Sequence, residues 1–396
     1  MAPRGGMRPT APEADNKAIA EPGPISLSIA ILDGLSFSEG VPPMRSPSLQ
    51  ASPLRPVIIP AIVLVSLSAC GKEARSHHAS TRLLAGIEQA VTFQRDLRLE
   101  ENPAVVNLSP RVKADLGGFL VADGLEQQLR LYAPDGRLRG RFGRRGSGPG
   151  EFEHLSAAVR LSDGTILAGD INGRLTRFDS MGTHVLRTSP SGLDPIYEML
   201  ALNDTTVVIV GRRGGQMQSP LVHEWNPSTE RVSRSYFPAP QGPPGFAAAY
   251  AFNGFATAAT RGDTVAVVFA LQDSVHLFVR GGEIGTLPVP MRGIRRLAAP
   301  LSPPPPDRFQ AWFESFSTPN GLYWLKDGSF LIQYLDRKGP DSLFSLLHMR
   351  RNGEPVWVSP GSPRLLAISS EGSLVFVKRG AAAPNQWSIA SLPAGR

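Results

Sequence analysis

The chain has 396 residues, 41% hydrophobic and 19% charged, a composition typical of a globular protein with a sizeable core. Its 40 glycines and 37 prolines favour many turns over long helices, and its single cysteine excludes an intramolecular disulfide and a zinc site of the Cys₄ or Cys₂His₂ kind. The formal net charge is +7, and because acids and bases balance within residues 1–69, the excess lies in residues 70–396.

The composition of residues 1–69 predicts targeting and processing segments rather than a folded domain. Residues 1–43 are rich in Pro, Gly and Ala, and we expect them to be a spurious or disordered N-terminal extension, with Met44 as the true start. Residues 44–69 predict a signal peptide, because Arg45 and Arg55 precede an apolar run over 57–69. That run is shorter than the roughly 20 residues that a membrane-spanning helix needs.

The end of the apolar run carries a motif. Leu67, Ser68, Ala69 and Cys70 resemble the lipobox of bacterial lipoproteins. The resemblance implies that signal peptidase II recognises Leu67, Ser68 and Ala69 and cleaves before Cys70, whose acylated thiol anchors the chain in a membrane. A plain signal peptide or a single-pass anchor is the alternative. Because Gly71-Lys72, directly after Cys70, contain no Asp, the resemblance favours the periplasmic side of the outer membrane over the inner membrane. Residues 70–82 then predict a flexible tether.

Residues 83–396 contain six diverged repeats of one hairpin pattern. Turns carrying Gly, Asn or Asp precede runs rich in β-branched and aromatic residues, and each run leads into a second strand. The runs span 119–123, 165–170, 205–211, 263–271, 329–335 and 373–379. The sixth repeat ends at 387–392 without an outermost strand, which residues 91–99 could supply. We therefore predict an all-β fold, a six-bladed β-propeller closed by an N-terminal strand and preceded by a lipoprotein signal peptide.

The first two repeats carry a more specific likeness. Phe142-Gly143, the glycine-rich stretch 146–152 (GSGPGEF) and the stretch 163–182, with Asp163-Gly164 and Phe178-Asp179, resemble NHL-type propellers over roughly 45 residues. The resemblance implies structural roles only. The glycines allow tight chain reversal, and we expect the three phenylalanines of the pattern to pack between blades. They are Phe142, Phe152 and Phe178.

The sequence contains no familiar catalytic or metal-binding motif. The seven histidines show no HExxH or other metal-ligand spacing, no GxSxG elbow occurs, and the glycine-rich stretch lacks the order of a phosphate-binding loop. We therefore assign no catalytic, cofactor or metal residue and expect no cofactor. Propellers that act as lactonases resemble this architecture and hold a metal over the central channel, so Asp123, Asp170 and Asp263 are the acids to inspect. Turn acids that bond local backbone are the favoured interpretation.

The densest basic segment spans 137–145 (RLRGRFGRR). On a strand, Arg137, Arg139 and Arg141 share one face, and with Arg144 and Arg145 they form a candidate contact for phosphate-bearing lipid head groups or another polyanion. A solvated outer strand is the alternative. We expect no nucleic-acid partner, because basic charge alone is weak evidence.

These observations favour a membrane-anchored, non-catalytic β-propeller that binds a protein, peptide or glycan in the cell envelope. The alternative is a metal-dependent, lactonase-like hydrolase or lyase that uses the mouth of the central channel. A third hypothesis is a structural envelope factor within a larger assembly.

Overall fold

The computed structural model describes residues 81–101, 112–115, 117–180, 184–188, 192–214, 219–238, 256–270, 272–296, 308–338, 341–380 and 385–393. The predicted signal peptide and Cys70 lie outside the described residues. Across those ranges the protein is almost entirely β, as predicted, with one 3₁₀ turn, η1 (Ile87–Gln89), and one short helix, α2 (Phe309–Glu314). Neither is long and apolar enough to cross a membrane.

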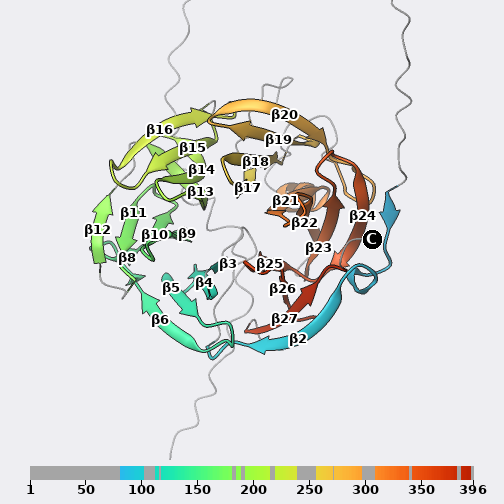
Figure 1. The fold of residues 1–396 in the computed structure, drawn as a ribbon, viewed down its shortest axis with the longest axis horizontal. Helices are drawn as coiled ribbons and strands as arrows, with labels where there is room; N and C mark the ends of the chain where they lie inside the picture. Colours follow the sequence, from blue (N-terminus) through green and yellow to red (C-terminus); the bar gives the residue numbers. More distant parts are fainter. Residues whose placement is uncertain are drawn as a thin grey trace, which may run out of the picture. The chain divides into compact units, whose positions relative to one another are not determined.

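Six sheets, antiparallel except for one added strand, form the blades of a ring (Figure 1), which confirms the predicted six-bladed propeller. Each of the first three blades has four strands, which follow one another from the innermost to the outermost. Blade 1 comprises β3 (Val112–Asp115), β4 (Gly118–Asp123), β5 (Gln128–Tyr132) and β6 (Leu138–Phe142). Blade 2 comprises β9 (Leu155–Arg160), β10 (Ile166–Asp170), β11 (Leu175–Phe178) and β12 (His184–Thr188). Blade 3 comprises β13 (Leu193–Asn203), β14 (Thr206–Arg213), β15 (Val222–Asn226) and β16 (Arg231–Tyr236).

The last three blades follow the same order, but the final two borrow strands from the N-terminal side of the ring. Blade 4 comprises β17 (Ala256–Arg261), β18 (Thr264–Phe269), β19 (Ser274–Val279) and β20 (Gly282–Pro288). Blade 5 comprises β21 (Ser317–Trp324), β22 (Phe330–Lys338), β23 (Asp341–Met349), β24 (Pro355–Ser362) and the added β1 (Arg82–Leu83). Blade 6 comprises β25 (Leu365–Ile368), β26 (Leu374–Val377), β27 (Gln386–Ser391) and β2 (Thr92–Arg98).

The turns that mark the repeats in the sequence occupy the expected places between first and second strands. Gly164 and Gly328 have φ of 84° and 89°, a backbone region that side chains disfavour. The residue before each, Asp163 or Asp327, accepts a hydrogen bond from the backbone N–H two residues on, and Asn203 does the same in blade 3. Local chemistry at these three turns therefore sets the start of the second strand.

Apolar side chains fill the space between neighbouring blades, and six such clusters run round the described part of the ring. Between blades 1 and 2 lie Phe142, Phe152 and Phe178, as predicted, with ring centroids 6.0–6.1 Å apart around Phe178. Gly143 has φ of 73°, and a Cβ there would lie 2.3 Å from Phe152 Cε2, so this position requires glycine. Two minor strands, β7 (Arg144–Arg145) and β8 (Glu151–Phe152), pair in the same segment.

The ring closes where the sequence pattern predicts. Strand β2 pairs antiparallel with β27, from Thr92 opposite Ser391 to Arg98 opposite Gln386. Its Leu97 is 4% exposed and packs in the cluster that joins blade 6 to blade 1. Closing the last sheet with an early strand covers its outer edge and joins both ends of the described chain in one blade.

A second contact of the N-terminal segment with the ring was not predicted from the sequence. Strand β1 adds to the outer edge of blade 5, parallel to β24, with Arg82 opposite Trp357. Leu84 and Ile87 follow it into the apolar cluster between blades 5 and 6. The segment from 82 to 98 thus holds the outer edges of two adjacent blades together.

The strand order defines two faces of the ring. The hairpin face carries the turns between first and second strands and between third and fourth strands, such as 262–263 and 280–281. The crossover face carries the turns between second and third strands, such as 124–127 and 171–174, and the links between blades, such as 363–364.

Candidate functional site

The channel acids singled out from the sequence do not meet. Asp123 is fully buried at the end of β4 on the crossover face. One of its oxygens accepts the backbone N–H groups of Leu125 and Glu126 at 3.1 and 3.0 Å, and the other lies 3.2 Å from Arg130 Nη2. Asp123 therefore organises its own turn, as the favoured interpretation expected.

Asp170 repeats this arrangement one blade further on. Its Oδ1 accepts the N–H groups of Asn172 and Arg174 at 3.0 and 3.1 Å, and its Oδ2 binds the guanidinium of Arg174. Asp263, in contrast, lies in the β17–β18 turn on the hairpin face. These three acids do not converge on one mouth of the channel. In the part of the chain that the structure describes, no group of three or more His, Cys, Asp or Glu side chains could hold a metal ion.

A serine, a histidine and an aspartate do come together in blade 5, but in the wrong order for a catalytic triad. Ser329 Oγ donates to Asp327 Oδ1 at 2.6 Å, and His348 Nε2 lies 2.9 Å from the same hydroxyl. The aspartate thus contacts the serine and its turn rather than orienting the imidazole, as a triad requires. Burial lowers the pKa of His348 and favours the neutral ring.

Among the described residues, an ion pair between two innermost strands joins blades 1 and 3, which are not neighbours in the ring. Lys113 Nζ of blade 1 lies 2.8 Å from Glu198 Oε1 of blade 3. The other oxygen, Glu198 Oε2, accepts Thr257 Oγ1 at 3.0 Å and the N–H of Ala258 at 3.1 Å, both from blade 4. Glu198 is 3% exposed. With both oxygens satisfied, this group is a structural link between three blades.

The predicted basic face lies on the outer strand of blade 1. Arg139 and Arg141 lie on β6, and Arg137 is exposed just before it. Arg137 Nε lies 2.7 Å from Asp135 Oδ2, and Arg141 pairs with Glu101. Arg139 is exposed and makes no ion pair with any described residue. Neighbouring acids therefore balance two of the three charges.

The other two arginines of the segment lie on β7. Arg144 pairs with Glu151 at 2.8 Å, and Arg145 donates to the backbone carbonyl of Leu125. The five arginines share one region of blade 1, but most of them already have partners within the chain. A contact with a polyanion at this face stays a prediction.

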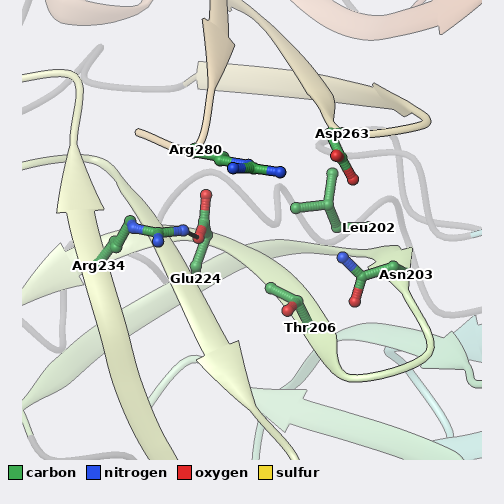
Figure 2. A pocket seen from close by; sticks show the side chains of 7 residues that line it. All are labelled: Leu202, Asn203, Thr206, Glu224, Arg234, Asp263 and Arg280. Atoms are coloured by element: carbon green, nitrogen blue, oxygen red, sulfur yellow. Dashed lines mark hydrogen bonds and ion pairs between the residues drawn. The ribbon is translucent and has the colours of Figure 1, made fainter. Parts of the chain in front are cut away.

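A pocket of about 270 Å³ lies on the hairpin face, between blades 3 and 4. Figure 2 shows its lining. Blade 3 contributes Glu224 and Arg234 from its outer half, and blade 4 contributes the turn residues Asp263 and Arg280. The β13–β14 hairpin of blade 3 adds Leu202, Asn203 and Thr206. Two carboxylates and two guanidinium groups thus meet in one small concavity.

Glu224 is the buried group of this pocket. It is 2% exposed, and its Oε2 accepts a hydrogen bond from Arg234 Nη1 at 2.8 Å. Its Oε1 is buried as well, and the carboxylate also accepts a hydrogen bond from the phenol of Tyr236. In Figure 2 this second oxygen points toward the side of the pocket that holds Arg280. Burial raises the pKa of the Tyr236 phenol, and the charge of Glu224 and the hydrogen bond that the phenol donates to that carboxylate raise it further.

Arg280 and Asp263 form the exposed lip of the pocket, and neither makes an ion pair or side-chain hydrogen bond with a described residue. Arg280 has φ of 51° and Gly281 has φ of 77°, in the two-residue loop between Val279 and Gly282. This is the backbone of a type I′ hairpin, where Asn or Gly is preferred at the first position. An arginine there costs about 1 kcal/mol of backbone strain.

Sequence reasoning missed this pocket. Its residues come from several strand ends and turns spread over 202–280, and no local motif joins them. The one signal in the sequence was the Val279-Arg280-Gly281-Gly282 turn, in which a long charged residue occupies a position that usually carries a small polar one.

Comparisons with known proteins support the fold but identify no family and no function. The sequence matches no family model and no curated protein. A protein of Bacteroides fragilis named "putative exported protein" has a similar structure, with a TM-score of 0.56 and 9% identity over 79% of this chain and 98% of that one. A member of the DUF4221 family from Bacteroides vulgatus gives a TM-score of 0.54 and 11% identity over 76% of this chain and 97% of that one.

Proposed function

We propose that this protein is a lipid-anchored propeller of the bacterial envelope that binds a peptide or another small ligand without transforming it. One observation carries the proposal. The pocket between blades 3 and 4 gathers four charged side chains, and one of them, Arg280, lies on the exposed lip and makes no ion pair with a described residue. A concavity with an unpaired guanidinium suits a polar ligand that carries a carboxylate or another acceptor group.

The contacts of the buried acids support binding over chemistry. Asp123 and Asp170 use their oxygens on their own turns, and Glu198 uses both of its oxygens on links between blades. Glu224 is likewise held within the chain, by Arg234 and by the phenol of Tyr236, so Arg280 is the charged group of this pocket that is open to a ligand. The segment around Phe142–Phe152 also supports an NHL-like relationship, and propellers of that kind offer broad faces for binding.

The proposed anchor is the acylated Cys70. Thr81, eleven positions further on, is 7% exposed, and its carbonyl accepts Arg292 Nη1 at 2.9 Å at the rim of blade 5. A fully extended chain of that length spans about 40 Å. Acylation at Cys70 would therefore leave at most about 40 Å of extended chain between the lipid anchor and Thr81. In our proposal the anchor lies on the periplasmic side of the outer membrane.

The anchor is tested by globomycin, which inhibits signal peptidase II. We expect the treated cells to accumulate precursor and a Cys70→Ser variant to lose incorporation of labelled fatty acid. Normal processing under globomycin, or fatty-acid labelling of Cys70→Ser, would refute the anchor.

Binding is tested separately on acylated protein isolated from its own envelope. Small molecules and peptides released from the native protein are compared by mass spectrometry with those released from an Arg280→Asn variant. We expect at least one species to be retained by the native protein and lost from the variant. Identical contents would refute the pocket as the binding site.

A further inference from the structure

We propose that Ser274, His276 and Glu283, on the two outer strands of blade 4, are a serine nucleophile, its general base and the carboxylate that orients the base, and that they hydrolyse uncharged carboxylic esters. This activity goes beyond the proposed function and uses a different site, because Ser274 begins β19 at the opposite end of that strand from the Arg280 turn.

The three side chains contact one another in the order that a catalytic triad requires. Ser274 Oγ lies 3.3 Å from His276 Nε2, and His276 Nδ1 lies 2.8 Å from Glu283 Oε1. Because the carboxylate faces Nδ1, the neutral imidazole carries its proton there, and Nε2 is left to accept the proton of the Ser274 hydroxyl. In the blade 5 group, by contrast, the carboxylate of Asp327 accepts the hydroxyl of Ser329.

The register of the two strands brings these residues together. Ser274 and His276 are two positions apart on β19 and therefore share one face of the sheet. Strand β20 runs antiparallel to it, with Thr286 opposite His276 and Glu283 opposite Phe278. Thr286 Oγ1 donates to Glu283 Oε1 at 2.8 Å. The hydrogen bonds from His276 and Thr286 lower the pKa of Glu283, so this carboxylate stays ionised beside the imidazole.

Aromatic side chains hold the imidazole in place. The side chain of His276 is 14% exposed. Phe237 meets its ring edge to face with centroids 4.9 Å apart, and Phe278 lies nearly parallel to it at 6.5 Å. Phe237 has φ of 59°, a conformation that a bulky residue rarely adopts and that is found at sites where the fold maintains strain. Ser274 itself is partly exposed. The base is therefore fixed while the nucleophile is accessible, as the reaction needs.

The proposed reaction is a double displacement that needs only water as the second reactant. His276 Nε2 takes the hydroxyl proton as Ser274 Oγ attacks the carbonyl carbon, the bond from that carbon to the alcohol oxygen breaks, and the proton passes to the alcohol. Water then attacks the acyl-serine and gives a proton to Nε2, which returns it to Oγ as the carboxylic acid leaves. The charge of Glu283, whose side chain is 45% exposed, favours uncharged esters over anionic ones.

The first test is labelling of the purified full-length protein with a fluorophosphonate, which phosphonylates an activated serine oxygen and releases fluoride. The tryptic peptide 262–280 contains Ser274 as its only serine, so mass spectrometry reads the site directly. We expect label on this peptide, its loss in Ser274→Ala and at least tenfold slower labelling in His276→Gln. Ser329→Ala is the matched control, because that serine also contacts a histidine, and it should leave the labelling of 262–280 unchanged.

The second test is turnover of p-nitrophenyl acetate, an uncharged ester. Glu283→Gln should lower kcat at least tenfold and leave KM unchanged, because Glu283 acts through the imidazole and not on the substrate. Its thermal melt should match that of the native protein, since Glu283 is half exposed. Ser329→Ala should turn over the ester at the native rate.

Three results would overturn the proposal: the peptide 262–280 takes up no label, its labelling survives Ser274→Ala, or Glu283→Gln keeps the native kcat. The three side chains would then be only a polar cross-strand contact on the outer wall of blade 4. Both assays read Ser274 whether or not the pocket at Arg280 holds a ligand.

Discussion

Closure of the ring by β2 predicts a specific energetic cost. Leu97 is the one buried side chain of that strand, 4% exposed, and it packs in the cluster of Trp387 and Phe119 that joins blade 6 to blade 1. The rings of Phe119 and Trp387 meet edge to face with centroids 5.4 Å apart, which leaves little freedom to refill a void. Leu97→Ala should therefore destabilise the protein by about 3 kcal/mol, a large part of the typical stability of about 5–15 kcal/mol.

The assay is guanidinium unfolding followed by tryptophan fluorescence. Leu125→Ala is the matched control, because Leu125 is 45% exposed in the β4–β5 loop and its truncation should cost less than about 0.5 kcal/mol. The reasoning would be refuted if the two variants unfolded at the same denaturant concentration, since β2 would then contribute no packing to closure.

Three further changes test other parts of the fold. Burial is the main cause that lowers the pKa of His223 from 6.5 to about 4, and the charge of Arg213 adds to it. Between these two pH values the unfolded chain therefore binds a proton at His223 that the folded chain does not bind. Stability should fall as pH drops from 6.5 toward 4, by about 2 kcal/mol at pH 5, and denaturant midpoints of His223→Gln should lack this part of the loss. Gly143→Ala should cost about 2 kcal/mol or more because its Cβ meets Phe152, as a thermal melt would show; an unchanged melt would contradict the close approach of the Phe152 ring to this turn. Lys113→Met should cost about 3 kcal/mol by leaving Glu198 buried without its counter-ion, and the double variant with Glu198→Gln should recover part of that loss in urea unfolding.

The repeats were predictable because each depends on neighbours in sequence. A turn acid and its glycine, as in Asp163-Gly164, fix a hairpin locally, and the apolar run that follows has to be buried. The closing strand was predictable for a different reason: the sixth repeat lacked an outer strand, and the segment 91–99 had no other sheet to join. Strand β1 was not predictable, because the two residues Arg82–Leu83 are too few to show a pattern.

The pocket could not be predicted from the sequence, because its lining residues come together only through the way blades 3 and 4 pack against each other. Glu224 on β15 and Arg234 on β16 are cross-strand partners, which an alternating pattern suggests in general terms. The position of Arg280 over them depends on how blade 4 packs against blade 3 through Phe278 and Tyr236. Sequence periodicity carries no information on that packing, so the four charges looked like ordinary surface residues.

Burial alone does not distinguish a structural carboxylate from a binding one in this ring. Glu198 and Glu224 are 3% and 2% exposed, and each forms an ion pair of 2.8 Å with a basic residue on another strand. Their other contacts are also similar: Glu198 accepts hydrogen bonds from Thr257 and Ala258 of blade 4, and Glu224 accepts one from the phenol of Tyr236. The two acids differ in their surroundings, because Glu224 lines a pocket whose exposed lip carries Arg280, a cation in a left-handed turn that makes no ion pair with a described residue. Arg280, rather than the burial of Glu224, is therefore the physical reason to look for a ligand at this place on the hairpin face.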